Sequence, residues 1–512
     1  MLALLLYITT LQPGLSLPDS AVVVSAMQQP TISAFACNHS LSNICGWLIT
    51  HIIPWGTTPW RANLVSALYG STLLALFFLL GRRLNISPLL AAACTASLAV
   101  SHGVWWHSTI AENYTLSALL LTLCAHLLIT NPRTPTAPTI FWLTTITALS
   151  IFNHLQNGVL LLGTLWALPE LWQRRSSLRR PAIAGLTLGI APYLLLALWE
   201  VSSGRAGTQW FAWLFGGGGF TSQMFVWQGW QTITSPLRIW LWNYPGLFGL
   251  IAAGGLLYAL RTALRRTGNW RLARLLTATF TITFLFFSGY DTWDRFSFLL
   301  LAHTAAAIAA LAALSQWENH IQTGTGHSKL APLRPILITA LLTTAAWTPL
   351  FYVTTVNALL SNTGTNWLTR PYVAIARQYH GRFNMAGMLL DPVRRDQGTI
   401  ENFIRTTLDS LPQNTTWVDD NTLYYQTRWL QQHETLRSDI TMKLLATDLM
   451  PGYGEDAHTL AMARQWRDPD TRWFLTSTNG LSHEMVKALK PFNWHITLYP
   501  LNNSHGLFEI IK

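Results

Sequence analysis

Residues 62–81 read ANLVSALYGSTLLALFFLLG and are followed at once by Arg82 and Arg83. This uncharged run has the length that an α-helix needs to cross the hydrocarbon core of a membrane, about 20 residues. Similar apolar runs occur at residues 1–17, 86–104, 114–130, 138–154, 157–172, 181–199, 244–260, 275–290, 296–314 and 335–354. The sequence therefore predicts an α-helical polytopic membrane protein with about eleven transmembrane helices.

The composition also indicates a membrane protein. Half of the 512 residues are hydrophobic and only 11% are charged, whereas about a quarter of the residues in an average soluble domain are charged. The formal net charge of +11 does not indicate a nucleic acid partner, because the arginines stand in short clusters between apolar runs and not along one continuous face. We expect membrane lipids to surround residues 1–355.

The basic residues predict how the chain is oriented. If the N-terminus is inside, the cytoplasmic connections contain Arg82, Arg83, Arg133, Arg174, Arg175, Arg179, Arg180, Arg261, Arg265, Arg266, Arg271, Arg274, Lys329 and Arg334. The outer connections contain only Arg61, Arg205, Arg238 and Arg295. Because the connections richer in Lys and Arg face the cytoplasm, we expect a cytoplasmic N-terminus and, after an odd number of spans, a C-terminus outside.

Two outer connections, residues 18–61 and 200–243, are too long to be simple turns. In the first, residues 41–55 are apolar but too short to span, which favours an amphipathic helix in the interface. Cys37 and Cys45 in this loop could form a disulfide if the compartment is oxidising. In the second, six tryptophans surround Gly216–Gly219, which indicates either an aromatic belt at the headgroups or a mobile loop over a lipid-linked substrate.

After Thr354 the composition changes to polar residues, acids and prolines. Short strands are expected at 416–419, 473–476 and 495–499, and helices at 399–410, 422–433 and 483–489. Alternation of this kind is typical of a small α/β domain. We therefore expect two domains: a transmembrane domain at 1–355 and a soluble α/β domain at 356–512 on the outer face.

Asp19 is the sharpest candidate for chemistry. No phosphate-binding glycine loop, CxxC pair or HExxH motif occurs, so a nucleotide or zinc mechanism has no support. Asp19 directly follows the first expected span, where partial desolvation would raise the pKa of its carboxyl group and make it a better base. The alternative is that Asp19 only caps the helix after it.

Further polar residues are expected at the outer ends of other spans. His102 and His107 lead to Glu112, which is either a second site carboxylate or the acidic first turn of a span. Asn153 and His154 lie in a tight turn at a depth where polar groups are costly unless they are used or paired. The outer arginines Arg61, Arg238 and Arg295 either bind a lipid phosphate through their guanidinium forks or flank their spans.

Several spaced motifs in the first third of the chain carry a family likeness. They are Leu11-Gln12-Pro13-Gly14 with Asp19-Ser20, Pro54-Trp55-Gly56 with Trp60-Arg61-Ala62-Asn63, Trp105-Trp106 with Ala111-Glu112-Asn113-Tyr114, and Asn153-His154. Together they resemble the protein O-mannosyltransferase-like family of multi-span membrane proteins in the GT-C glycosyltransferase superfamily. The segment from Leu408 to Ile440 also resembles the soluble tail of its bacterial members.

The resemblance implies a GT-C-like fold and an inverting glycosyltransferase. Such an enzyme takes a sugar, with mannose as one candidate, from a polyprenyl-phosphate carrier to an exported protein or envelope-glycan acceptor. By position Asp19 is the expected general base, Glu112 and His154 match polar positions near the pocket, and Arg61 is a candidate for the carrier phosphate. The expected location is the bacterial inner membrane with a periplasmic C-terminal domain; a divalent metal ion is left open, and no other cofactor is expected.

Two departures from the family pattern leave alternatives open. Asp19-Ser20 is followed by Ala21-Val22, so the second acid usual at this point is missing, and only His39 stands near the place of a His-Pro-Pro-Gly stretch. Either the acceptor differs from the usual one or the chain is a non-catalytic envelope scaffold. A flippase for a lipid-linked glycan is a further alternative, but the chain shows no paired, interrupted spans in two related halves.

Overall fold

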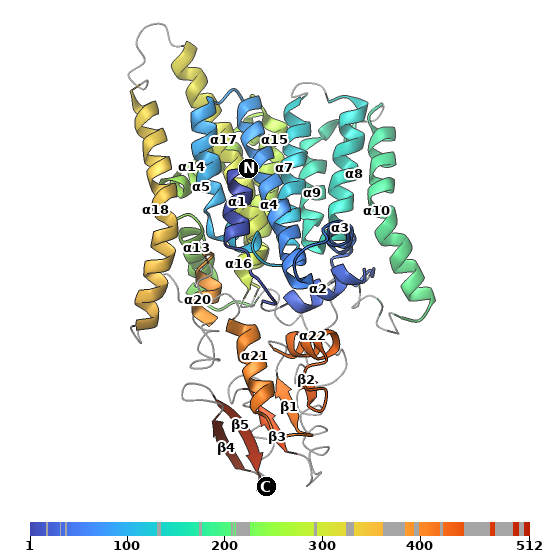
Figure 1. Cartoon of the computed structure of the whole chain (residues 1–512). Helices are drawn as coiled ribbons and strands as arrows, with labels where there is room; N and C mark the ends of the chain where they lie inside the picture. Colours follow the sequence, from blue (N-terminus) through green and yellow to red (C-terminus); the bar gives the residue numbers. More distant parts are fainter. Residues whose placement is uncertain are drawn as a thin grey trace.

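In the computed structural model, a bundle of helices carries a smaller domain with a β-sheet at one end (Figure 1). The structure describes residues 1–361 apart from 17–18, 31, 36–37, 131–134, 174–176, 206–207, 209, 211–213, 215–225, 291–293 and 324–331. Of the later residues it describes 385–393, 399–419, 423–444, 472–476, 495–500 and 506–511. The expected helix at 483–489 lies outside these ranges.

Six helices of the described chain are long and apolar enough to cross a membrane. They are α4 (Thr58–Arg83), α10 (Arg179–Ser202), α14 (Leu247–Arg265), α15 (Trp270–Ser288), α17 (Leu300–Thr323) and α18 (Leu333–Ser361). Shorter apolar helices are α5 (Pro88–Ala99), α7 (Tyr114–Thr130), α8 (Ala137–Asn153) and α9 (Gly158–Ala167). Each coincides with an expected span, so the predicted α-helical polytopic fold is confirmed.

The first expected span, residues 1–17, differs from the prediction. Only Leu2–Thr9 is helical and forms α1. At 1.5 Å per residue, eight helical residues extend about 12 Å, which is less than half of a hydrocarbon core of about 30 Å. Pro13 and Gly14 explain why the helix does not continue, because the residue before a proline avoids the helical region and glycine disfavours a helix interior. The segment is therefore not one continuous crossing.

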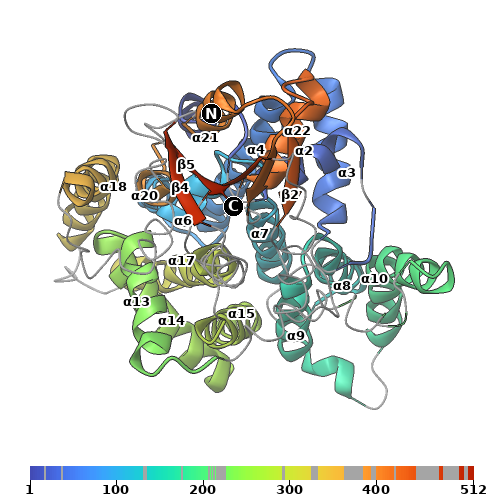
Figure 2. The ribbon, with the colours of Figure 1, turned by 90° about the horizontal axis from the view of Figure 1, so that it is seen from below.

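Helices α8 and α10 are neighbours in the bundle (Figures 1 and 2) and pack closely through two glycines. A Cβ atom at Gly185 would lie 2.3 Å from the carbonyl oxygen of Phe141, and one at Gly189 would lie 2.4 Å from that of Thr145. In membranes, small residues allow this close approach of two helix backbones, and van der Waals packing then drives the association.

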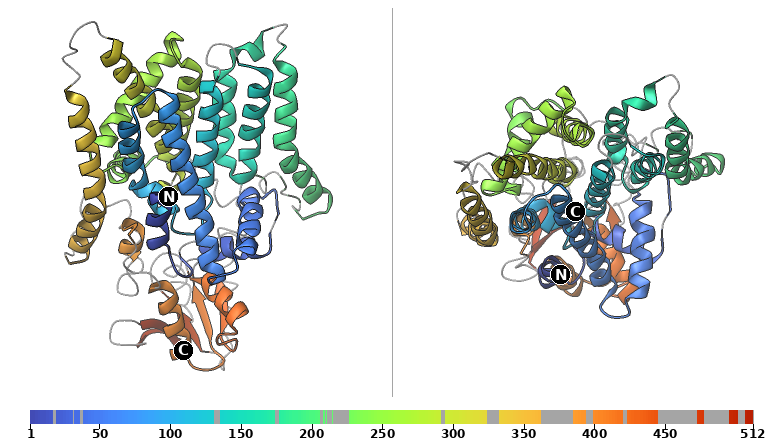
Figure 3. Two further views of the ribbon diagram at one scale, coloured as in Figure 1. Left: turned by 45° about the horizontal axis from the view of Figure 1, so that its top comes forward. Right: turned by 90° about the horizontal axis from the view of Figure 1, so that it is seen from above.

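The arginine-rich helix ends lie at the end of the bundle away from the C-terminal domain (Figures 1 and 3). There Arg271 forms an ion pair with Glu170, and Arg334 forms one with Glu318 at 2.8 Å. The bundle thus separates a basic end from the end that carries the soluble domain, which is the separation that the positive-inside rule requires. The compartment that each end faces stays a prediction.

Three helices lie at the end of the bundle that carries the soluble domain (Figure 1): α2 (Ser20–Gln28), α3 (Ser40–Ile52) and α13 (Trp230–Asn243). Helix α3 is the helix expected at 41–55. Cys37 lies outside the described residues, so the possible disulfide between Cys37 and Cys45 stays a prediction. The run Gly216–Gly219 lies outside them too, so the belt and the mobile loop both stay predictions.

The C-terminal domain has a five-stranded sheet in the order β2-β1-β3-β5-β4. Its strands are β1 (Thr416–Asp419), β2 (Thr441–Leu444), β3 (Trp473–Leu475), β4 (His495–Pro500) and β5 (Gly506–Ile511), and its main helices are α21 (Thr399–Ser410) and α22 (Tyr424–Glu434). Strand β1 pairs in parallel with β2 and β3, whereas β5 is antiparallel to β3 and β4. The expected α/β character is confirmed, and β2 and β5 are additions.

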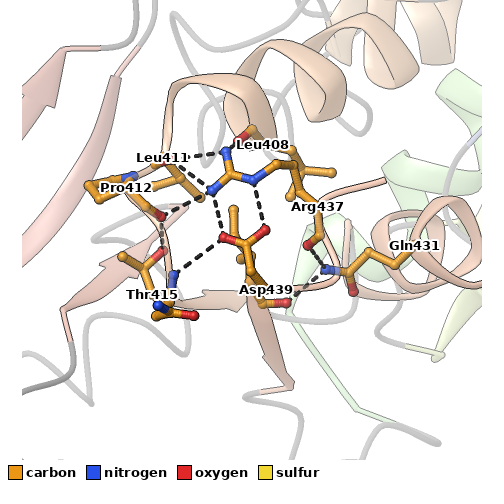
Figure 4. Close-up of polar contacts among 9 residues, drawn as sticks. Leu408, Leu411, Pro412, Thr415, Gln431, Arg437 and Asp439 are labelled. Carbon is orange, nitrogen blue, oxygen red and sulfur yellow. Dashed lines mark hydrogen bonds and ion pairs between the residues drawn. The ribbon is translucent and has the colours of Figure 1, made fainter. Parts of the chain in front are cut away.

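A polar cluster ties α21 to the start of β2 (Figure 4). The Arg437 guanidinium binds both carboxylate oxygens of Asp439 at 2.8 and 2.9 Å and donates to the carbonyl oxygens of Leu411 and Pro412 at 3.1 and 3.2 Å. Ionic hydrogen bonds of this fork geometry are among the stronger ones. The ion pair lowers the pKa of the Asp439 carboxyl to about 2, so the cluster stays charged at neutral pH.

Helix α20 (Met385–Leu390) follows the predicted domain boundary but packs on the bundle. The indole nitrogen of Trp106 donates to the carbonyl oxygen of Met388 at 2.9 Å, and Nε2 of His102 lies 2.8 Å from that of Leu389. The sheet domain is therefore connected to the bundle through a helix that the bundle itself holds.

Candidate functional site

The segment that leads to Asp19 is held between the bundle and the C-terminal domain. From the bundle, Nδ2 of Asn63 in α4 donates to the Gln12 carbonyl oxygen at 2.7 Å. From the C-terminal domain, Nε2 of Gln426 in α22 donates to the Ser16 carbonyl oxygen at 2.9 Å. Asp19 comes three residues after Ser16, directly before α2. The segment before the candidate base is therefore hydrogen-bonded both to the helix bundle and to the C-terminal domain.

Helix α4 also holds the segment that carries Glu112. Oδ1 of Asn63 accepts from the Ala111 amide at 2.7 Å. One turn later, Oγ of Ser66 donates to the Glu112 carbonyl oxygen at 3.0 Å and accepts from the Glu112 amide at 3.1 Å. One face of α4 thus holds both the Gln12–Gly14 segment that precedes Asp19 and the backbone of Glu112.

Asp19 is exposed to solvent, and many protein atoms lie around its carboxylate. Burial, with the nearby charge of Asp294 as a second cause, raises the pKa of Asp19 to about 6. Asp19 occupies the N-cap position of α2, yet its side chain makes no capping hydrogen bond. The carboxylate is therefore not used to cap the helix, and its raised pKa makes it a better proton acceptor than an ordinary aspartate.

Tyr114, the first residue of α7, marks the centre of the site. It lies within electrostatic range of three carboxylates, those of Asp19, Glu112 and Asp294. Glu112 is buried, with 6% of its surface exposed, and Asp294 is half-buried. Acids from three distant segments of the chain thus meet around one phenol. Among the residues that the structure describes, no group of three or more His, Cys, Asp or Glu side chains could hold a metal ion.

Two histidines form one wall of the site. The rings of His39 and His154 stack at 4.9 Å with 17° between their planes, and the ring of His154 lies 5.4 Å from that of Tyr114. His39 donates through Nδ1 to the Asn153 carbonyl oxygen at 2.9 Å, whereas Nδ1 of His154 accepts from the Gln156 amide at 3.2 Å. Burial lowers the pKa of His39 to about 4, so its ring is neutral at pH 7. Because its Nδ1 accepts, neutral His154 carries its proton on Nε2.

His107 and Asn153 lie behind this wall. The ring of His107 is 5.1 Å from that of Tyr114. Nδ2 of Asn153 donates to the Asn113 carbonyl oxygen at 3.2 Å and to Oγ of Ser117 at 2.9 Å. His107 therefore packs against Tyr114, and Asn153 supplies hydrogen-bond partners to the buried polar groups at the start of α7.

His102 and Arg61 serve the packing of other elements. His102 is buried and contacts α20 through the Leu389 carbonyl oxygen at 2.8 Å. Arg61 donates through Nη1 to the carbonyl oxygens of Thr50 and Ile53 at 3.0 and 3.1 Å. These carbonyl groups belong to the C-terminal end of α3, where a cation is favourable. Neither side chain is brought to Tyr114 by the contacts that the structure shows.

The two other predicted arginines differ in their positions. Arg295 follows Asp294 and is buried, with 6% of its surface exposed, and its Nε donates to the Tyr290 carbonyl oxygen at 2.7 Å. It therefore lies at the edge of the carboxylate cluster. Arg238 is buried in α13, which lies on another part of the bundle (Figure 2).

Sequence reasoning missed several residues that build the site: His39, Asn63, Ser66, Gln426 and the contribution of Asp294. Asn63 and Ser66 lie in a stretch that resembles the O-mannosyltransferase-like family, so a role for them could have been proposed from that motif. Gln426 lies 407 residues after Asp19 in the chain, and no local pattern connects the two.

The whole-chain fold can be compared with solved structures. No protein-family model and no curated protein sequence matches the chain. The crystal structure of ArnT from Cupriavidus metallidurans bound to undecaprenyl phosphate aligns with a TM-score of 0.57 at 13% identity, over 99% of this chain and 96% of that one. The apo state of the same protein gives a TM-score of 0.54 at 14% identity with the same coverage.

An oligosaccharyltransferase from Archaeoglobus fulgidus, in complex with Zn and sulfate, aligns with a TM-score of 0.47 at 11% identity, over 99% of this chain and 72% of that one, which is too distant to carry an argument. Identities this low show the fold alone. The chain is thus a polytopic α-helical membrane protein of the GT-C-like fold class with a C-terminal domain that contains a small sheet, as the sequence predicts.

Proposed function

We propose that the protein is an inverting membrane glycosyltransferase that moves a sugar from a polyprenyl-phosphate carrier to a protein or envelope-glycan acceptor on the outer face. The observation that carries the proposal is the Asp19 carboxylate, which has a raised pKa and stands directly before α2, the helix that packs on α22 of the C-terminal domain. The fold agrees, because ArnT, which shares it, was crystallised with undecaprenyl phosphate.

The reaction needs one base and one displacement. The Asp19 carboxylate takes the proton of an acceptor hydroxyl group, and the hydroxyl oxygen forms a bond to the anomeric carbon of the donor sugar. The bond between that carbon and the phosphate oxygen breaks, and the polyprenyl phosphate leaves with the electron pair. Because the oxygen attacks opposite the leaving group, the configuration at the anomeric carbon is inverted.

Neighbouring side chains have separate roles in this proposal. Asp294 keeps negative charge near Asp19, which raises the affinity of Asp19 for the acceptor proton, and Glu112 is the second carboxylate beside Tyr114. The neutral His154 offers its Nε2 proton as a hydrogen-bond donor to a sugar hydroxyl. Arg295 at the edge of the cluster is the proposed contact of the carrier phosphate, since a guanidinium group matches phosphate geometry. Arg61 holds α3 and has no such role.

Transfer of radiolabelled sugar tests the proposal. Purified protein in detergent receives polyprenyl-phosphate mannose, glucose or arabinose, and an envelope extract supplies acceptors. We expect transfer by the natural sequence and by Asp409→Asn, a matched control in which an exposed aspartate of α21 is changed. We expect Asp19→Asn to lose at least about a hundredfold in rate, since a positioned base contributes 10²–10⁴-fold.

Two outcomes would contradict the proposal. Full transfer by Asp19→Asn would remove Asp19 as the base. No transfer from any of the three donors by natural protein whose folding is verified by thermal unfolding would instead favour the non-catalytic scaffold or the flippase.

A further inference from the structure

Helix α22 of the C-terminal domain lies against the segment that carries Asp19. Gln426, in its first turn, is fully buried, and its Nε2 donates to the Ser16 carbonyl oxygen at 2.9 Å. The next residue toward the N-terminus, Tyr425, lies within electrostatic range of Asp19. Helix α22 also packs on α2, which begins directly after Asp19.

A second contact from the same domain reaches the same segment. The Glu401 carboxylate on α21 lies 3.4 Å from the Leu15 amide and is held by Arg405 at 2.6 Å. Gly14 leaves the space that this carboxylate occupies, because a Cβ atom there would lie 2.1 Å from Oε2 of Glu401. The path of the chain from Gly14 to Ser16 is thus set by the C-terminal domain as well as by α4.

We propose that Gln426 is a positioning residue, which through its hydrogen bond to the Ser16 carbonyl group directs the Asp19 carboxylate into the site. The inference rests on the proposed function, since it assigns Gln426 a role in the same reaction. Docking of the C-terminal domain and assembly of a competent base are then one event. If the Ser16 carbonyl group loses this hydrogen bond, the Asp19 carboxylate can shift from its position. A misplacement of about 1 Å costs up to about a hundredfold in rate.

Helix α22 contains a matched control for this contact. Gln431 lies on the same helix and is buried, and its Nε2 also donates to backbone carbonyl groups, those of Arg437 and Ile440 at 3.1 and 2.8 Å (Figure 4). These partners belong to the C-terminal domain, so Gln431 makes the same kind of hydrogen bond without reaching the Asp19 segment. Substitution of Gln431 therefore measures how much stability the protein loses when a buried glutamine is removed from α22.

The experiment compares Gln426→Met and Gln431→Met in the full chain, because methionine keeps the shape of glutamine but cannot donate. Rate constants and the pH profile of transfer are measured together with thermal unfolding. A second readout needs no turnover: a hydrophobic carbodiimide labels protonated carboxyl groups, and mass spectrometry gives the pH at which labelling of Asp19 is half complete. The titratable groups within electrostatic range of Asp19 are Asp294, Tyr114 and Tyr425, and of these Asp294 raises the pKa of Asp19.

We expect Gln426→Met to lower kcat about 10- to 100-fold with little change in the donor KM, and to shift the labelling midpoint of Asp19. Gln431→Met should lower thermal stability but leave kcat and the midpoint unchanged. Gln426→Asn, which withdraws the amide by one methylene group, should show the same changes in weaker form and replaces Gln426→Met if that variant does not fold.

The inference is wrong if Gln426→Met behaves like Gln431→Met in both kcat and the labelling midpoint. That failure is distinct from failure of the proposed function. If Asp19→Asn is inactive while Gln426→Met transfers sugar at the natural rate, Asp19 remains the proposed base, and only the positioning role of Gln426 is contradicted. If the natural sequence transfers no sugar, the labelling midpoint still decides whether Gln426 controls the environment of Asp19.

Discussion

At the scale of single residues, the notable relation is between Asp19 and the acids around it. The sequence lacks a second acid directly after Asp19-Ser20, a departure from the family that it resembles. In the structure, the charge of Asp294, from a distant segment, raises the pKa of Asp19. Glu112, Asp19 and Asp294 all lie within electrostatic range of Tyr114. Negative charge that is missing from the local motif is thus present in space, in agreement with the proposed role of Asp19 as the base.

The pKa of Asp19 sets an expected pH dependence. A base must be ionised, and burial together with Asp294 raises the pKa of the Asp19 carboxyl to about 6. The rate of transfer should therefore rise with pH through about 6 and level off above it. Asp294→Asn removes the neighbouring charge, so we expect the acidic limb of the pH profile of kcat/KM to move to lower pH by about half a unit or more.

The control for this shift is Asp409→Asn, whose carboxylate is exposed on α21 and should leave the limb in place. An acidic limb that stays at the same pH in Asp294→Asn would show that the charge of Asp294 does not act on the base.

At the scale of elements, α4 and α22 hold the site from opposite sides. Asn63 and Ser66 on one face of α4 bind the segment before Asp19 and the backbone at Glu112. Gln426 on α22 binds the segment before Asp19 from the C-terminal domain. Helices are suited to this role because their own backbone hydrogen bonds are satisfied, which leaves side chains free to hold an irregular segment.

The packing of α8 against α10 gives a second prediction at this scale. Gly189→Ala places a Cβ atom within 2.4 Å of a backbone carbonyl oxygen, which cannot move without separating the helices. We expect a loss of about 1–3 kcal/mol in the free energy of unfolding, seen as a lower midpoint of thermal unfolding in detergent.

Gly254→Ala is the matched control, because Gly254 also lies inside an apolar helix, α14, but a Cβ atom there meets nothing within 4 Å. That variant should be neutral or slightly more stable, since alanine is the better helix former. Equal effects of the two variants would contradict close packing of α8 on α10.

At the scale of the whole molecule, the bundle separates a basic end from the end that carries the C-terminal domain. The proposed reaction requires that this domain face the compartment where the polyprenyl-linked sugar and the acceptor meet. The positive-inside rule places the basic end in the cytoplasm, and the proposed location is therefore the inner membrane with a periplasmic site.

Cysteine labelling in intact cells measures this orientation. In a background with the four native cysteines changed to serine, we expect a membrane-impermeant maleimide to label Asp409→Cys from outside. Arg180→Cys, at the exposed basic end of α10, should react only after permeabilisation. The reverse pattern would place the C-terminal domain in the cytoplasm and exclude an outer-face transferase.

The sequence by itself determined the membrane class, the positions of most helices and, in the C-terminal domain, β1, β3, β4, α21 and α22. It could do so because these features are local: an apolar run of sufficient length must form a helix in lipid, where no water satisfies the backbone. The expected span at residues 1–17 differs from the structure for a reason that is also local, since Pro13 and Gly14 keep α1 from continuing beyond Thr9. Asp19, Glu112 and His154 were predicted as site residues on their positions and the family resemblance.

Only the tertiary structure decided which polar groups meet. The stacking of His39 on His154, the approach of Asp294 to Asp19 and the bond from Gln426 to Ser16 join segments far apart in the chain. The same structure assigned Arg61 to the end of α3 and His102 to α20. The physical reason is that such contacts depend on how helices pack, and packing is set by the shapes of all the side chains between them.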